Sequence, residues 1–205
     1  MKLTLNYLLR FLSIASLLAL TACSEPDYKW SLYDVSGHLP DLEFSLKGVG
    51  NKTVTQADLK NKTVLVFFGY ASCPDICPTT MAQLTEVLGK LGDDARDVRI
   101  LFISVDPHRD KPDMLQAYVD AFNKNAIGLT GSENEVAALA RRYRIAYQIE
   151  KPKPGDNAET YDVTHSRGVF MFDRFGKARL LASDTEAIDK VTADLRHLLQ
   201  ITKPK

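Results

Sequence analysis

The sequence has little cysteine, no excess of either charge and no long apolar run, and each shortage narrows what the protein can be. Its only cysteines are Cys23, Cys73 and Cys77, and the one close pair among them closes too short a loop to staple a fold. The 26 basic side chains are matched by 26 acidic ones, without a basic run, which argues against a nucleic-acid partner. There is no internal repeat and no interdomain linker, so we expect one domain of ordinary size.

The first 22 residues are typical of a secretory signal. Their apolar core, residues 11–20, is about ten residues long, whereas a membrane-spanning helix needs about 20. The segment ends Leu20-Thr21-Ala22-Cys23, which resembles the bacterial lipobox, where cleavage precedes the cysteine and lipid is attached to its sulfur. We therefore expect residues 1–22 to be a lipoprotein signal peptide and Cys23 to be the lipidation site. The alternative is an ordinary signal peptide with a chance cysteine near its cleavage site.

Lipid chains on Cys23 would anchor the mature chain to a membrane that it does not span. We expect residues 23–38 to be a lipidated tether and residues 39–205 to form the folded domain, which would face the periplasm or another extracytoplasmic space. That compartment is oxidising, so Cys73 and Cys77 would persist there as a disulfide or as metal ligands.

Hydrophobic periodicity alternates between strands and helices over the rest of the chain. Strands are predicted at residues 41–46, 63–68, 99–105 and 147–149, with a hairpin formed by 168–172 and 178–181. Helices are predicted at residues 79–91, 112–122, 133–143 and 185–199. Ser132 and Glu135 form a capping box for the third helix, and Ser183 or Asp184 would cap the last. This order predicts an α/β domain of three layers.

Cys73 and Cys77 are the residues that point most directly to chemistry. They lie four positions apart, directly after a buried strand and at the start of a helix, where that spacing places both side chains on one face. A Cα separation of about 6 Å suits either a disulfide or two thiolates on one ion. The positive end of the helix dipole lowers the pKa of at least one thiol. The alternative is a pair of buried cysteines that serve only as small apolar side chains.

Four segments are informative together: FFGYASCPDICP at residues 67–78, SVDPHRD at 104–110, LTG at 129–131 and THS at 164–166. In combination they resemble the SCO/SenC family of copper proteins in cytochrome oxidase assembly. The similarity covers roughly residues 39–199. It implies a thioredoxin-like fold with a central mixed sheet, and copper held by Cys73, Cys77 and His165. The chain has Ala71 and Thr164 where the family usually has Thr and Asp.

Two thiolates and an imidazole form a soft donor set that suits Cu(I), and copper is the cofactor that the resemblance implies, as Cu(I) or Cu(II). The same donors with a water molecule would also hold zinc. We interpret His38, His108 and His197 as ordinary histidines. Asp75, Asp106 and Asp110 are expected to be solvated loop residues, with an acidic rim facing a partner as the alternative. Tyr70 would shield the metal or simply pack.

The residues leave two main functions open. In the first, Cys73, Cys77 and His165 hold copper and pass it to a partner. The resemblance implies that this partner is the dinuclear copper centre of cytochrome c oxidase subunit II, with another copper-receiving protein as the alternative. In the second, the cysteines act as an extracytoplasmic thiol-disulfide oxidoreductase, where one attacks a partner disulfide and the other resolves the mixed disulfide. The four-residue spacing and the distant histidine favour the metallochaperone, because dedicated oxidoreductases normally use Cys-x-x-Cys. A thiol peroxidase is a third, weaker hypothesis.

Overall fold

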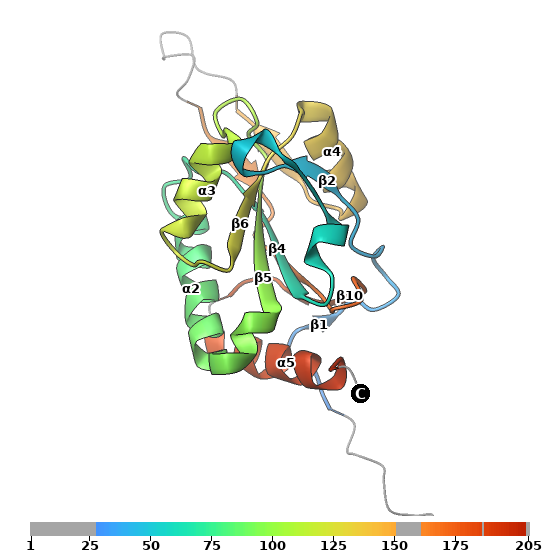
Figure 1. Ribbon diagram of the computed structural model, residues 1–205. Coiled ribbons are helices and arrows are strands. Elements are labelled where there is room, and N and C mark those ends of the chain that lie inside the picture. Colours follow the sequence, from blue (N-terminus) through green and yellow to red (C-terminus); the bar gives the residue numbers. More distant parts are fainter. Residues whose placement is uncertain (1–27, 151–160, 186, 204–205) are drawn as a thin grey trace, which may run out of the picture. The chain divides into compact units, whose positions relative to one another are not determined.

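The computed structural model describes residues 28–150, 161–185 and 187–203 (Figure 1). The expected signal segment 1–22 and the lipidation site Cys23 lie outside these ranges, so the predictions about them stay predictions. Across the three described ranges, no helix combines the length and the apolar character needed to cross a bilayer.

A six-stranded mixed sheet forms the centre of the domain, in the order β1-β10-β9-β4-β5-β6. Three neighbouring strands are parallel: β4 (Thr63–Gly69), β5 (Val98–Ser104) and β6 (Ala126–Leu129). The other three run antiparallel to their neighbours: β9 (Val169–Phe172), β10 (Ala178–Ala182) and β1 (Tyr33–Asp34). The expected α/β fold with a central mixed sheet is thus confirmed. The pattern alone did not predict β6, whose four residues are too short for a clear period.

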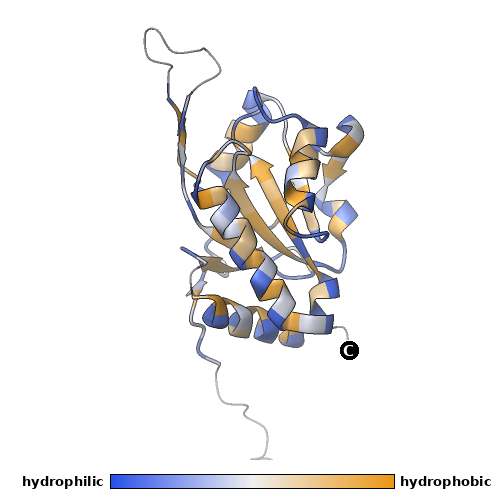
Figure 2. Ribbon diagram, turned by 90° about the vertical axis from the view of Figure 1, so that its left-hand side faces the viewer, coloured by the Kyte–Doolittle hydropathy of each residue, from blue (hydrophilic) through white to orange (hydrophobic). Residues whose placement is uncertain are grey.

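Four helices flank this sheet: α2 (Ile76–Leu91), α3 (Pro112–Asp120), α4 (Glu133–Arg142) and α5 (Ile188–Ile201). Figure 1 shows α2 and α3 on one side of the central strands and α4 on the other. Because both faces are covered, every residue of β4 is buried, and the central strands are largely hydrophobic in Figure 2. Three short 3-10 helices complete the helical elements of the described residues: η1 (Val49–Asn51), η2 (Gln56–Leu59) and η3 (Gly92–Asp97).

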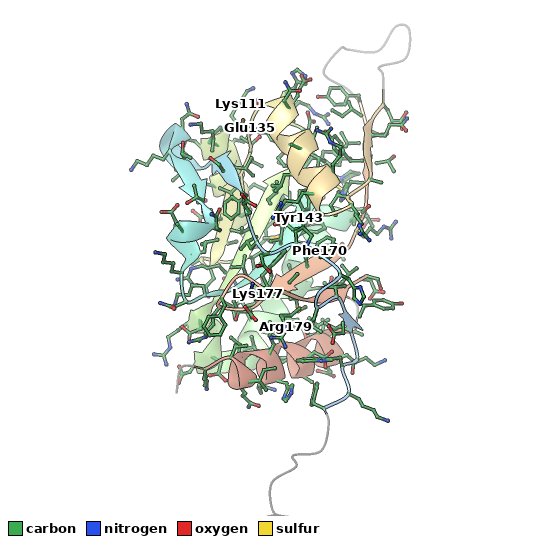
Figure 3. The ribbon with its side chains drawn as sticks, turned by 90° about the vertical axis from the view of Figure 1, so that its right-hand side faces the viewer. Lys111, Glu135, Tyr143, Phe170, Lys177 and Arg179 are labelled. Atoms are coloured by element: carbon green, nitrogen blue, oxygen red, sulfur yellow. The ribbon has the colours of Figure 1, made fainter. Side chains whose placement is uncertain are left out.

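Aromatic packing joins α4 to its face of the sheet. The Tyr143 ring, at the end of α4, lies 6.3 Å from the Phe170 ring and 5.5 Å from the Phe172 ring, between centroids (Figure 3). The Tyr143 hydroxyl donates to the carbonyl of Asp41 and accepts from the amide of Glu43. This one side chain therefore connects α4, the main sheet and the segment before β2 (Ser45–Lys47).

The helix starts agree only in part with the sequence-based expectations. The capping box of Ser132 and Glu135 on α4 is confirmed. The expected cap of α5 is wrong, because α5 begins at Ile188 and its N-cap, Ala187, has no side chain able to accept a hydrogen bond. Helix α2 begins at Ile76, three residues before the expected start, which brings Cys77 into its first turn.

Two small antiparallel pairs lie outside the main sheet. One joins β2 (Ser45–Lys47) to β3 (Thr53–Thr55), and the other joins β7 (Tyr147–Ile149) to β8 (Val163–His165). Strand β2 is shorter than the strand expected at residues 41–46. The second pair matters for function, because its last residue is His165.

The folded domain begins before residue 39, the boundary expected from the sequence. Tyr33 and Asp34 form β1, which pairs with Leu181 and Leu180 of β10. Ahead of β1, the amides of Ser31 and Leu32 both donate to Oδ2 of Asp194 at 2.8 Å, and Asp194 is fully buried on α5. The last part of the expected tether is therefore part of the sheet.

This attachment predicts a loss of stability when Asp194 is changed. Hydrogen bonds to a charged group contribute about 1.5–3 kcal/mol each, so we expect Asp194→Ala to lower the free energy of unfolding by about 3 kcal/mol in urea denaturation. The control is Asp189→Ala on the same helix, whose side chain is 90% exposed and which should cost less than about 1 kcal/mol. Equal losses in the two variants would contradict the attachment.

Candidate metal centre

The two cysteines lie where β4 passes into α2, but they do not share a helix. Cys77 is the second residue of α2, whereas Cys73 belongs to the loop before it, so the expected helix face carrying both is wrong. The loop still brings them together, because the amide of Cys77 donates to Sγ of Cys73 at 3.5 Å. Both thiols are free. Cys77 is fully buried and Cys73 is partly exposed.

Gly69, the last residue of β4, makes room for Cys77. A Cβ atom built on Gly69 would lie 2.8 Å from Sγ of Cys77 and 3.1 Å from the ring of Phe102. Side chains do not approach that closely without displacement, so only glycine lets the thiol pack on the strand. Gly69 of the motif thus has a steric role in the site.

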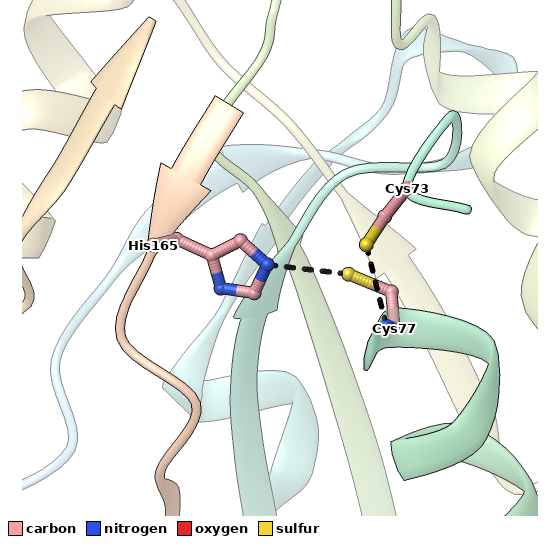
Figure 4. Close-up of side chains that lie close together, drawn as sticks. All are labelled: Cys73, Cys77 and His165. Carbon is pink, nitrogen blue, oxygen red and sulfur yellow. Dashed lines mark hydrogen bonds between the residues drawn. The ribbon is translucent and has the colours of Figure 1, made fainter. Parts of the chain in front are cut away.

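His165 reaches the cysteines from β8, 88 positions further along the chain (Figure 4). Its Nε2 lies 3.4 Å from Sγ of Cys77, and its Nδ1 lies 2.9 Å from the carbonyl oxygen of Ser166. A carbonyl oxygen can only accept, so Nδ1 carries the ring proton and Nε2 presents its lone pair to the thiol. This tautomer is the one that binds a metal through Nε2.

The ligand atoms of Cys73, Cys77 and His165 all lie within 4.8 Å of one another. Within the described ranges, no other cluster of three or more His, Cys, Asp or Glu side chains is arranged to hold a metal ion. Two sulfur atoms and one imidazole nitrogen fit a soft ion in three-fold coordination, as Cu(I) prefers, and the set would also accept zinc with a fourth ligand.

Electrostatics differ between the two thiols. Burial opposes ionisation of Cys73, but backbone N–H groups, of Asp75 first and of Cys77 and Ile76, outweigh it and hold the pKa of Cys73 below its ordinary value. Burial raises the pKa of Cys77 far above its ordinary value. Burial likewise lowers the pKa of His165, which keeps the imidazole neutral and able to coordinate.

A groove of about 280 Å³ opens onto the site. Cys73 and His165 line it together with Pro74, Asp75 and Asp162. Cys77 does not reach the groove and closes the inner side of the site. Two ligands are therefore accessible from solvent and the third is enclosed by protein.

The expectations for two of the loop carboxylates are wrong. Asp106 and Asp110 are fully buried, so they are neither solvated loop residues nor a rim facing a partner, whereas Asp75 is exposed. Oδ2 of Asp110 accepts from the amide of Ala71 at 2.9 Å and from the hydroxyl of Ser104 at 2.6 Å. The sequence contained one signal for the contact between Asp110 and the cysteine loop. The two loops follow adjacent parallel strands, and such loops meet at one edge of a sheet.

Comparison with known proteins gives concordant results. The family model described as SCO1/SenC matches residues 38–200. A mitochondrial SCO2 homolog of Bos taurus is 32% identical over 77% of this chain and 62% of its own length. A SCO2-like protein of Rickettsia felis is 32% identical over 66% of this chain and 65% of its own length. The chain thus spans less than two thirds of either relative.

Two solved structures show the same fold. The crystal structure of Arabidopsis thaliana ScoI with copper bound has a TM-score of 0.70 and 31% identity, and the match covers 78% of this chain and 98% of that one. BsSco, described as a member of the Sco family of cytochrome c oxidase assembly proteins with a disulfide switch, has a TM-score of 0.59 and 25% identity, covering 85% and 98%.

Fold and site together define a thioredoxin-like domain with a Cys-Cys-His group that is arranged to hold a metal ion. The match over residues 38–200 places the chain more exactly: it belongs to the SCO1/SenC family.

The asymmetry of the two thiols predicts different reactivity. In the reduced, metal-free protein at pH 7, we expect iodoacetamide to modify Cys73 at least about tenfold faster than Cys77, because Cys73 is partly exposed and more ionised, whereas Cys77 is buried. Mass spectrometry of digests taken over time measures both rates. Because the pKa of Cys73 is lowered in the folded protein, its modification rate should level off at a lower pH there than in the protein unfolded in guanidinium. In guanidinium the two cysteines should react at the same rate. Faster modification of Cys77 in the folded protein would refute the assignment.

The close approach at Gly69 predicts a steric effect. We expect Gly69→Ala to push Cys77 aside, lower the free energy of unfolding by about 1–3 kcal/mol and weaken metal binding. The matched control is Gly89→Ala on the exposed side of α2, where an added Cβ meets nothing within 4 Å and should stabilise by about 0.5–1 kcal/mol. Thermal unfolding and metal titration of both variants measure this. Unchanged behaviour of Gly69→Ala would rule out the steric role.

Proposed function

We propose that this protein is a copper metallochaperone. It binds one copper ion through Cys73, Cys77 and His165 and assists assembly of the dinuclear copper centre of cytochrome c oxidase subunit II. The observation that carries the proposal is the convergence of two thiols and the Nε2 atom of a neutral imidazole within 4.8 Å. Membership of the SCO1/SenC family and the copper-bound Arabidopsis relative support copper over zinc.

The shape of the site supports transfer of the metal over permanent storage. Three ligands leave one side of a bound ion open, and the groove over Cys73 and His165 gives an incoming donor access to it. Transfer would proceed by ligand exchange: each partner ligand that binds the ion replaces one ligand of this chain. Exchange would begin at Cys73 and His165, and the enclosed Cys77 would release the ion last.

Cu(I) is the proposed cargo state, because two thiolates with one imidazole form a soft, low-coordinate set. Cu(II) in a thiolate-rich site is the second form that the proposal includes. Coordination requires both cysteines as thiolates, so binding displaces the proton of Cys77, whose pKa burial holds high in the free protein.

A thiol-disulfide oxidoreductase is the second candidate, favoured by the contrast between an exposed, more acidic Cys73 and a buried Cys77. The Cys73 thiolate would attack a partner disulfide and release one partner thiolate. After losing its proton, Cys77 would attack Sγ of Cys73 and release the second. The partner gains two electrons, and this chain is left with a Cys73–Cys77 disulfide. The disulfide switch described for BsSco supports this chemistry.

We also propose that lipid on Cys23 anchors the protein to a membrane, with the copper site in the periplasm or another extracytoplasmic space. The support is the lipobox-like sequence before Cys23 and the short apolar core of residues 11–20. Such an anchor would keep the domain near an acceptor in the same membrane.

Anaerobic Cu(I) titration against a competing chelator tests the metallochaperone. The reduced chain from Ser24 onward should bind one Cu(I). Cys73→Ser and His165→Ala should each weaken binding by more than the roughly 10–100-fold that loss of an outer partner causes. His108→Ala removes a histidine outside the site and should bind as the wild type does. Unchanged affinity in either ligand variant would disprove the three-ligand site.

A matched assay separates the two candidates. Reduced, copper-free protein is mixed with an oxidised peptide that carries the two cysteines of a copper-acceptor site. If the wild type reduces the peptide disulfide fast and stoichiometrically but does not bind Cu(I), the oxidoreductase is favoured. If the copper-loaded protein transfers Cu(I) to the reduced peptide, the chaperone is supported.

A further inference from the structure

His165 does not belong to the main sheet, so its position depends on other contacts. It lies in the two-stranded β7–β8 pair and not in the six-stranded sheet that supports the cysteines. On its C-terminal side the chain enters β9 at Val169 and is fixed by the main sheet. On its N-terminal side, β8 pairs with β7, and Tyr161, two residues before β8, makes further contacts with the loop that follows β5.

Arg109 contacts Tyr161 in two ways. Its Nη1 donates to the carbonyl oxygen of Tyr161 at 2.9 Å, and its guanidinium carbon lies 3.8 Å from the centroid of the Tyr161 ring. The planar side chain of Arg109 thus contacts both the backbone and the ring of Tyr161, which lies four residues before His165. A guanidinium suits this double role because it stacks and donates in fixed directions.

Asp106 orients Arg109 and Tyr161 together. Its carboxylate is fully buried, pairs with Nε of Arg109 and accepts from the Tyr161 hydroxyl at 2.8 Å. The side chain of Arg109 is only 18% exposed. Removing either donor would leave the buried carboxylate with too few partners, which strongly destabilises a folded protein. Arg109 and Tyr161 are therefore held together by Asp106.

The same loop also holds the cysteine side of the site. Asp110 follows Arg109 and accepts from the amide of Ala71, two residues before Cys73. Tyr70 completes the connection, since its ring lies 5.6 Å from the Arg109 guanidinium and 5.9 Å, edge on, from the His165 ring. Residues 106–110 therefore contact both halves of the metal centre.

We propose that Arg109 is a positioning residue for the metal centre, which keeps β8 at the distance where Nε2 of His165 meets the two thiols even when no ion is bound. This inference deepens the proposed function and rests on it where copper affinity is concerned. Arg109 touches none of the three ligand atoms, so its effect on binding must pass through the placement of His165.

The test compares Arg109→Lys in the wild-type and His165→Ala backgrounds. Lysine keeps the charge but loses the planar fork and the stacking. We expect Arg109→Lys to weaken Cu(I) binding about 10–100-fold in the wild type, as loss of an outer partner does, and to change nothing when His165 is absent. Tyr161→Phe keeps the ring and loses only the hydroxyl, so it should have a smaller effect. The electron paramagnetic resonance spectrum of the Cu(II) form should lose nitrogen hyperfine structure in Arg109→Lys.

Arg142→Lys is the matched control. Arg142 also pairs with a carboxylate, that of Glu43, and lies 5.9 Å from a tyrosine ring, that of Tyr143, but these partners belong to the segment before β2 and the end of α4 and not to the loops that carry the ligands. It should leave affinity and spectrum unchanged.

A metal-free readout separates this inference from the proposed function. In hydrogen exchange of the copper-free protein, Arg109→Lys should speed exchange at Val163 to His165, and Arg142→Lys should not. If the wild type binds no copper but this exchange responds, the proposed function fails and the positioning role stands. Equal affinity loss in both backgrounds, or exchange at residues 163–165 that does not change, would overturn the role of Arg109.

Discussion

The parallel pairing of β4 with β5 is the constraint on which the site depends. Its register sets Gly69 opposite Ser104, so the loops that follow the two strands leave the same edge of the sheet side by side. One loop carries Cys73 and leads into Cys77, and the other carries the Asp106–Asp110 segment. Antiparallel pairing would send these loops to opposite edges, and the cysteines would lose the hydrogen bonds that order their loop.

Burial keeps two of the three ligands uncharged in the metal-free site, and a bound cation would offset this effect for the thiol. Enclosing Cys77 and His165 disfavours their charged forms, so the free site contains a neutral thiol beside a neutral imidazole. A bound cation removes that penalty for the thiolate. Cys73 differs, because helix-start amides stabilise its anion and the groove admits solvent. The site therefore combines two ligands at the groove, the more acidic thiol of Cys73 and the neutral imidazole of His165, with one enclosed thiol, an arrangement that suits the proposed transfer of an ion.

Several features followed directly from local pattern. The apolar run of β4, the amphipathic helices, the capping box at Ser132 and the β9–β10 hairpin depend on neighbours in the chain, and they were predicted. The features that were missed depend on distant partners. Asp106 and Asp110 look like polar loop residues until Arg109, Tyr161 and Ala71 are brought around them. Likewise, β1 has too few residues to show a period and exists because β10 offers it an edge.

The cysteine pair, its place between a buried strand and a helix, and the α/β order of elements were determined by the sequence itself, because residue type and periodicity are local properties. The family resemblance also predicted His165 as the third ligand. Only the tertiary structure decided that Nε2 of His165 lies 3.4 Å from Cys77, that Cys73 stands outside the helix, and that Gly69 is needed where the thiol packs. The physical reason is that these features are distances between chain segments up to 88 positions apart, and such distances are set by strand register and packing.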